Sequence, residues 1–290
     1  MHRRNTSIRI LLFALPLLYL AALFIVPLIN LFRMSLADPS LSKTKAQGWT
    51  LANFGNVLLD PVVIDAMITT FRIGVFVTLL ALLIGYPISL FLTRTRSRWR
   101  GVLLALTLAP IFISIVVRSY GWIVLLSKRG VINSILLQLG VTSQPLHLIF
   151  NEFGIIIGTA HVLLPFMVLS VMGSLQVIEP SLESAAVSLG ARPWRVFRDI
   201  IWPLSLPGVG AGILLVFILA ISTFVTPMLL GGQVVMTLPI LAFQQFTSVF
   251  NWVEGSTVIV FLLVSVVIVS IIYERALRRK LSTVDLSRIK

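Results

Sequence analysis

The sequence contains no cysteine and few charged residues. The absence of cysteine excludes a disulfide framework, a thiolate nucleophile, an iron–sulfur site and a Cys-ligated zinc site. Only 11% of the 290 residues are charged, against about 25% in ordinary soluble domains, while 58% are hydrophobic. Since so little charge cannot cover a water-facing surface, the composition predicts an integral membrane protein.

Motifs for metal and nucleotide chemistry are also missing. The histidines are His2, His147 and His161, and no His-Glu-x-x-His pair or Gly-x-x-x-x-Gly-Lys-Ser/Thr phosphate loop occurs. Residues 229–233 resemble an ABC ATPase signature peptide, but without a phosphate loop their glycine pair is better explained as a helix terminator. No catalytic and no metal-ligating residue is therefore predicted. We expect His161 to be a packed polar residue that donates to a neighbouring helix, with a role in a solute pathway as the alternative.

Long stretches free of Asp, Glu, Lys and Arg predict helices that cross a membrane. Each must supply about 20 helical residues, and none shows the alternation of a barrel strand. The stretches are 10–32, 73–93, 101–127 (interrupted only by Arg118), 153–178, 200–253 and 255–273. The fifth is too long for one span, so we end that span near Leu230, before Gly231 and Gly232, and expect an outer loop with a partly buried helix to follow. The predicted fold is all-α, with six transmembrane helices.

The distribution of basic residues predicts the orientation of these helices. Lys and Arg gather in segments 1–9, 94–100, 192–198 and 275–290, whereas the alternate loops hold few. Short cytoplasmic loops collect positive charge, so both termini are expected in the cytoplasm. The net charge of +13 is then an orientation signal, and nucleic acid is excluded as a partner. We expect segment 10–32 to be a retained first helix, since a cleaved signal sequence has a shorter apolar region.

The loop at 179–207 contains signals for two short helices. Pro180 and Pro193 each suit a helix start, and Gly190 suits the left-handed residue that ends the first helix. Small residues at Ala185 and Ala186 would let another protein approach closely. The loop is therefore interpreted as a docking element; the alternative is an amphipathic connector lying on lipid headgroups.

This loop resembles the cytoplasmic loop of inner-membrane permeases of ABC importers, whose pattern is Glu-Ala-Ala, three residues, Gly, nine residues, Ile, one residue, Leu-Pro. Here Ser184, Gly190 and Ile200 hold that spacing, but Ser184 replaces Glu, with Glu183 one residue earlier, and Trp202 replaces Leu. The resemblance implies a type I ABC importer permease fold and a coupling helix that inserts into an ATPase subunit. The implied docking residues are Glu183, Ser184, Ala185, Ala186, Gly190 and Arg192.

A second resemblance, between Gly85 and Gly140, is to spermidine/putrescine-type permeases. The motifs that carry it are Gly85-Tyr86-Pro87, Ala109-Pro110, Val117-Arg118-Ser119-Tyr120-Gly121-Trp122, Gly130-Val131-Ile132-Asn133 and, further on, Leu163-Leu164-Pro165-Phe166. This similarity implies a solute that is a polyamine or a related cationic or amino-acid-like compound.

Together the resemblances imply a permease subunit that forms half of a translocation pathway in a bacterial inner membrane. The implied partners are a second, similar permease chain, two ABC ATPase subunits that bind ATP and Mg, an external solute-binding protein, and membrane lipid. The chain itself is expected to hold no cofactor and to be no enzyme. Its expected divisions are an N-terminal helix with an outer loop at 1–65, a permease core at 66–280 and a cytoplasmic tail at 281–290.

Candidate pathway residues lie near the expected outer ends of the helices. Arg118, Tyr120 and Trp122 are predicted around the outer mouth; alternatively Arg118 snorkels to headgroups or forms a structural ion pair. Aromatic faces there could stabilise an amine. Trp252 and Glu254 are predicted beside the pathway. The acids near the membrane are Asp60, Asp65, Glu152 and Glu254, which either are solvated loop charges or meet a solute or its binding protein.

Three alternatives remain open at this stage. One is an ABC permease for a different solute. Another is an ion-coupled secondary transporter, which needs ion-binding groups near the membrane midplane. The last is a membrane scaffold, in which loop 179–207 is an interaction site only.

Overall fold

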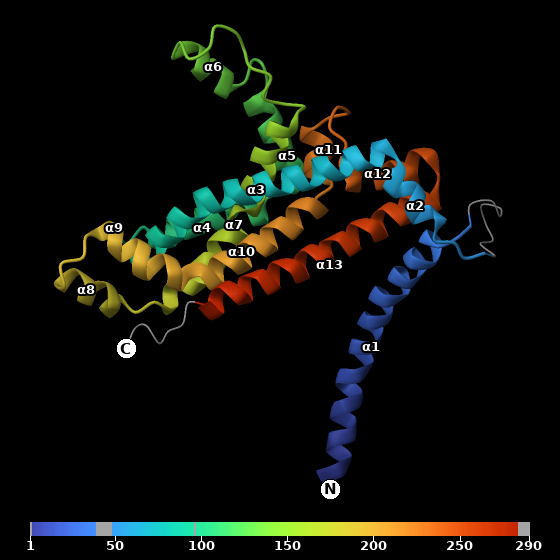
Figure 1. The fold of residues 1–290 in the computed structure, drawn as a ribbon, viewed down its shortest axis with the longest axis horizontal. Coiled ribbons are helices and arrows are strands. Elements are labelled where there is room, and N and C mark those ends of the chain that lie inside the picture. Colours follow the sequence, from blue (N-terminus) through green and yellow to red (C-terminus); the bar gives the residue numbers. More distant parts are fainter. Residues whose placement is uncertain (1, 39–47, 96, 284–290) are drawn as a thin grey trace. The chain divides into compact units, whose positions relative to one another are not determined.

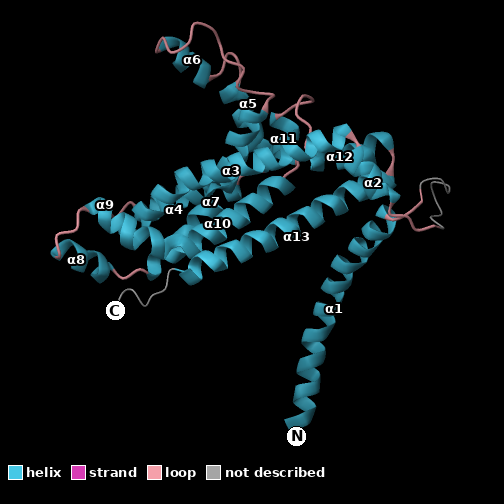
Figure 2. Cartoon of the chain, viewed as in Figure 1, coloured by secondary structure: helices cyan, strands magenta, loops and turns pink. Residues whose placement is uncertain are grey.

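The protein is described by a computed structural model that covers residues 2–38, 48–95 and 97–283. Arg96, Lys43, Lys45 and most of the expected tail 281–290 lie outside the described residues. Figure 1 traces the chain, and Figure 2 shows that the described part is built from helices joined by loops. The predicted all-α class is confirmed for this part, whose only strand-like pairing is one isolated bridge between Ala37 and Trp49.

The described residues form two compact units. The first contains the residues up to Ile64 together with Leu241–Val264, and the second contains Asp65–Ile240 and the described residues from Ser265 onward. The helix α13 (Trp252–Thr283) contributes residues to both units. The functional division at residues 65 and 280 stays a prediction.

Helices long and apolar enough to cross a membrane match the predicted spans. Among the described residues five qualify alone, and counting a bent pair as one span makes six, the number predicted. The five are Pro16–Ser35 of α1 (His2–Ser35), α3 (Pro61–Arg94), α7 (Glu152–Val177), Pro193–Ser222 and Trp252–Arg279 of α13. Segment Pro193–Ser222 consists of α9 (Pro193–Val196), η1 (Phe197–Ile201) and α10 (Trp202–Ser222). The sixth consists of α4 (Arg100–Phe112) and the segment Ile115–Gln138, which contains α5 (Ile115–Leu126) and α6 (Val131–Gln138).

The span predicted over 101–127 is not the one continuous helix that was expected. The axis turns by 104° between α4 and the following segment. The reason is local: Ile113 and Ser114 have extended ψ values of 133°, so the helical hydrogen-bond ladder stops after Phe112. Pro110, which has no N–H and lies in the last turn of α4, favours such an end.

The fifth span also ends earlier than expected. α10 (Trp202–Ser222) stops at an extended Thr223, and α11 (Val225–Leu230) follows as a separate short helix. Gly231 and Gly232 end α11 as expected, Gly232 with a φ of +60°. The expected partly buried helix after them is α12 (Leu238–Gln244), followed by a π-helical turn, η2 (Gln245–Val249).

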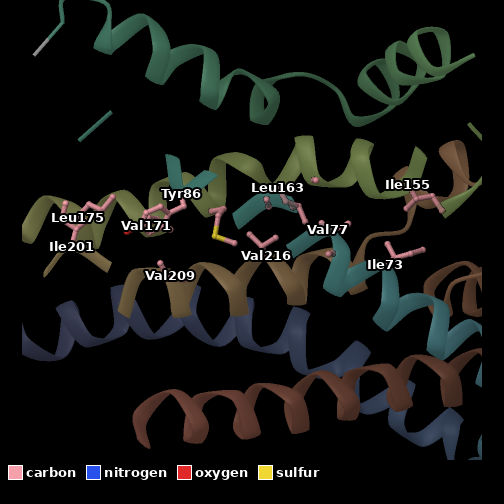
Figure 3. Close-up of a cluster of buried hydrophobic side chains, with 14 of the residues drawn as sticks. Ile73, Val77, Tyr86, Ile155, Leu163, Val171, Leu175, Ile201, Val209 and Val216 are labelled. Carbon is pink, nitrogen blue, oxygen red and sulfur yellow. The ribbon is translucent and has the colours of Figure 1, made fainter. Parts of the chain in front are cut away.

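The core of the second unit lies between α3, α7 and α10. Figure 3 shows side chains from these helices converging, among them Val77, Leu163 and Val216. Small residues allow close approach: a Cβ on Gly208 of α10 would lie 2.6 Å from the Ser170 carbonyl oxygen of α7, and the Ser170 hydroxyl donates to the Gly208 carbonyl at 2.9 Å. Such small-residue contacts are the usual means by which membrane helices pack tightly.

The first unit is held by an asparagine on α2 (Ala52–Leu59). The Asn53 amide group donates to the carbonyls of Ser35 and Ala37, at 2.9 and 2.8 Å, just where α1 ends. The Thr257 hydroxyl of α13 lies 3.3 Å from the same Ser35 carbonyl. These bonds satisfy carbonyl groups that the end of α1 leaves unpaired.

Candidate functional site

The loop at 179–207 has the two-helix form that the sequence predicts. α8 (Pro180–Ser188) begins at Pro180 and α9 (Pro193–Val196) begins at Pro193. Gly190 has a φ of +82°, and the Ala191 and Gly190 N–H groups donate to the Ala186 and Val187 carbonyls at 3.0 and 2.9 Å. This pair of bonds is the Schellman ending of a helix, which favours glycine at the left-handed position. In Figure 1, α8 and α9 form a hairpin between α7 and α10.

The predicted docking residues divide between two faces of α8. Ala186 is half-buried against the core cluster and Glu183 is half-buried beside it on the same side. Ser184 and Ala185 are exposed, and with them Val187 and Leu189, the latter 89% exposed. Of the remaining docking residues, Gly190 is exposed between the helices and Arg192 is exposed at the start of α9. The outward face of α8 therefore carries small apolar and hydroxyl side chains without charge, while its one carboxylate points inward.

Glu183 forms an ion pair with Arg94, the last residue of α3. Both side chains are largely buried, with exposed fractions of 24% and 25%. Arg94 Nη1 also donates to the carbonyl oxygen of Ile178, the residue that follows α7, at 3.5 Å. Arg94 was not predicted as a site residue, because it belongs to a run of basic residues that indicates orientation.

An aromatic cluster joins the second half of the loop to α3. The Tyr86 ring centroid lies 5.9 Å from that of Phe197 and 5.3 Å from that of Trp202. Phe197 also stacks on Trp194 at 5.5 Å. Phe197 opens η1 (Phe197–Ile201), a π-helical turn between α9 and α10, and such turns are rare and frequently occur at functional sites.

A hydrogen bond supports the same contact. The Ser205 hydroxyl donates to the Trp202 carbonyl at 2.9 Å, so Tyr86 is the donor in the 3.0 Å bond between its hydroxyl and the Ser205 oxygen. Tyr86 is buried, and its polar group is thereby satisfied inside the bundle.

Arg118 lies at the bend between α4 and α5. Its guanidinium group donates to the carbonyl of Pro110 and lies 3.5 Å from that of Ile113. These carbonyls belong to the end of α4, where the ladder leaves acceptors unpaired. Arg118 thus caps a helix end, a role that was not predicted from the sequence.

The other two candidates on α5 differ in their surroundings. The Trp122 indole N–H donates to His161 Nδ1 of α7 at 3.2 Å, with the rings edge-to-face at 5.6 Å. His161 therefore contacts a neighbouring helix as expected, but as the acceptor and not as the donor. Tyr120 is 57% exposed. The role of these residues in a pathway stays a prediction.

Trp252 and Glu254 lie in the first unit, at the start of α13. Glu254 and Asp60 line a pocket of about 220 Å³ together with Asn53, Asn56, Val57, Asn251, Val253 and Thr257. The Asn251 amide donates to Glu254 at 2.8 Å, and the Asn251 oxygen accepts from the Glu254 N–H at 3.2 Å, which caps α13. Trp252 is exposed and its ring lies 5.3 Å from that of Phe246.

Two of the acids expected near the membrane have structural partners. Asp60 ends α2 and its side chain accepts from the Val62 N–H at 2.8 Å, which caps the start of α3. Glu152, at the start of α7, forms an ion pair with Arg72 of α3. Since both side chains of this pair are partly exposed, its contribution to stability is small.

The fold and the loop together define a class of protein: a polytopic all-α membrane component with an exposed two-helix loop. Comparisons with known proteins place it more closely. The profile of the family described as "Binding-protein-dependent transport system inner membrane component" matches residues 81–283. The chain belongs to this family and is a multi-pass inner-membrane permease subunit of an ABC importer.

Similar proteins include two with named solutes. The spermidine/putrescine transport system permease protein PotB of Salmonella typhimurium strain SL1344 is 34% identical over 230 residues, covering 79% of this chain and 80% of that protein. PotB of Escherichia coli K12 is 33% identical, covering 79% of this chain and 83% of that protein.

Among solved structures, a similar chain occurs in a bacterial alginate ABC transporter in complex with an alginate pentasaccharide-bound periplasmic protein. That chain matches with a TM-score of 0.75 at 19% identity, and the match covers 96% of this chain and 97% of that one. This likeness confirms the ABC importer permease fold.

Proposed function

We propose that this chain imports a polyamine such as spermidine or putrescine, or a related cationic or amino-acid-like compound, as one of two permease subunits around a central pathway. It works with two ABC ATPase subunits, which bind ATP and Mg, and with an external solute-binding protein. Both termini lie in the cytoplasm. The chain itself hydrolyses nothing and holds no cofactor.

The observation that carries this proposal is the outward face of α8. Its exposed residues include Ser184, Ala185 and Val187, so it offers small, uncharged side chains on a helix that is fixed at both ends by proline and glycine signals. Such a surface lets another protein approach closely, whereas a helix lying on headgroups would present basic residues, and α8 has none. Of the other predicted docking residues, Glu183 and Ala186 lie on the inward side of α8, and Gly190 and Arg192 belong to the turn that follows.

The identity of the solute rests on different support. The two PotB proteins exceed 30% identity over most of both chains. The predicted pathway residues Tyr120, Trp122 and Trp252 offer aromatic faces to an amine, and Glu254 offers a carboxylate. The second permease subunit contributes the other half of the pathway.

The test is transport in vesicles that contain this chain purified with its associated proteins. We expect ATPase subunits to co-purify, and labelled spermidine delivered on its binding protein to enter only when ATP is supplied. An excess of unlabelled putrescine should compete, whereas an excess of molybdate or alginate should not. ATP-dependent uptake of a different solute would replace the polyamine assignment, and ion-driven uptake by this chain alone would overturn the proposal in favour of a secondary transporter.

A further inference from the structure

We infer that α3 is a coupling element of this subunit: it is tied to both halves of loop 179–207, through Arg94 and Tyr86, and moves with the loop when the ATPase moves it. The inference rests on the proposed function, because it assumes that an ATPase moves the loop. It concerns two residues at departures from the family pattern. Glu183 directly precedes Ser184, which replaces the Glu of Glu-Ala-Ala, and Trp202 replaces the Leu of Leu-Pro.

The first tie is the ion pair between Arg94 of α3 and Glu183, the acid that lies one residue before its usual position. Adjacent positions on an α-helix are about 100° apart around its axis. Ser184, at the position where a carboxylate is usual, is exposed on the outward face, whereas Glu183 is turned inward and pairs with Arg94. A shift of one residue thus changes the partner of the carboxylate from an external protein to α3.

The second tie is the aromatic contact between Tyr86 of α3 and Trp202, which replaces the usual leucine. Trp202 and Phe197 both contact the Tyr86 ring, and the Tyr86 hydroxyl bonds to Ser205 one turn further along α10. Aromatic contacts of this kind contribute about 0.5–1.5 kcal/mol each beyond simple burial. A leucine at position 202 would keep an apolar contact but would lose the ring pair.

The two ties act on one rigid element. Arg94 and Tyr86 are both on α3, separated by about 12 Å along the helix axis at 1.5 Å per residue. A helix fixed at two such points cannot slide or rotate against the loop without breaking a largely buried ion pair or an aromatic contact. Since the loop is continuous with α7 and α10 through the chain itself, these ties add α3 to the set of helices that the loop moves.

The test uses the complete transporter, with uptake and ATP hydrolysis measured in the same vesicles. We expect Arg94→Glu and Glu183→Arg each to lower uptake roughly tenfold, about 1.4 kcal/mol, while the ATPase remains bound and continues to hydrolyse ATP. The solute moved per ATP therefore falls. The exchanged variant Arg94→Glu/Glu183→Arg should recover most of the uptake, because it restores the pair with reversed charges. A matched control, Arg100→Glu on the exposed start of α4, should stay within about twofold of the wild type.

A second pair of variants separates the tie to α3 from a contact with the ATPase. Glu183→Gln removes the carboxylate, and Glu183→Gln/Ser184→Glu returns it to the usual position. We expect the second variant to be as poor as the first. Recovery on relocation would overturn the inference, because the carboxylate would then act outward; wild-type uptake in both charge-reversed single variants would overturn it as well.

A cross-link provides a measurement that does not depend on charge. Since the chain contains no cysteine, Arg94→Cys/Glu183→Cys can be joined selectively with a short flexible bis-maleimide. We expect the joined protein to regain the uptake that the unjoined variant loses, and loss of uptake on joining would overturn the inference. Absence of any ATPase from the purified wild-type complex would instead overturn the proposed function, so the two failures are distinguishable.

Discussion

The loop 179–207 and the pocket at the start of α13 use their polar groups differently. In the loop, the single carboxylate of α8 is paired with α3, and the outward face carries small uncharged side chains. In the pocket, the Asp60 carboxylate caps the start of α3 and the Glu254 carboxylate accepts from the Asn251 amide, while both acids line a cavity. The comparison teaches that a docking surface can be recognised by small exposed side chains without charge, whereas acids near a pathway must first be distinguished from acids that support a helix end.

The largest effect is expected at the turn of the loop. Gly190→Val places a β-branched residue at a φ of +82°, where such residues are genuine outliers. The turn between α8 and α9 must then change shape. Uptake should therefore fall by at least about tenfold, which corresponds to a rise in the barrier of at least about 1.4 kcal/mol. Gly173→Val is the matched control, since its Cβ also meets open space but its φ is ordinary. Equal uptake by the two variants in vesicle assays would contradict the role of the turn.

A large substitution on the outward face should separate docking from folding. Ala185→Trp adds bulk where α8 is exposed, so the chain should reach the membrane at normal levels but retain roughly tenfold less ATPase on purification. Ala185→Ser is the control and should retain it. Because Ala186 packs against the core, Ala186→Trp should lower the amount of folded chain instead. If Ala185→Trp retained normal amounts of ATPase and normal uptake, the outward face would not be the docking surface.

The pocket can be tested with a substitution that preserves the cap. Glu254→Gln keeps a side chain that can accept from Asn251 and removes the charge, so α13 should remain capped. If Glu254 guides a cationic solute, the KM for spermidine uptake should rise roughly threefold at low salt with little change in the maximal rate, and the difference should shrink as salt is added. An unchanged KM would leave the Glu254 carboxylate with its hydrogen bond to Asn251 alone.

The smallest expected effect concerns the aromatic cluster. Trp202→Leu restores the residue that is usual in the family and removes the ring contacts with Tyr86 and Phe197. The loss should be about 1 kcal/mol, measured as a Tm a few degrees lower for the purified chain. Trp99→Leu, at an exposed position, is the control. No difference in Tm between these two variants would show that the cluster contributes little.

Much of this architecture could be predicted from local signals in the sequence. Uncharged stretches located the spans, and Pro180, Gly190 and Pro193 determined the loop because each acts on the backbone near it. The break after Phe112 was missed, since Pro110 is compatible with a continuous membrane helix and the extended Ser114 has no distinctive neighbour. The pair of Arg94 and Glu183 joins residues far apart in the chain, so no periodicity or spacing could reveal it.

The cap that Arg118 places on α4 has a consequence for a positively charged solute. An arginine near the entrance of a cation pathway would ordinarily raise an electrostatic barrier. Here the guanidinium lies on the carbonyl end of a helix, which carries a partial negative charge of about half an electron. The helix end offsets about half of the positive charge, so a polyamine approaching that region would meet weaker repulsion than from a free arginine.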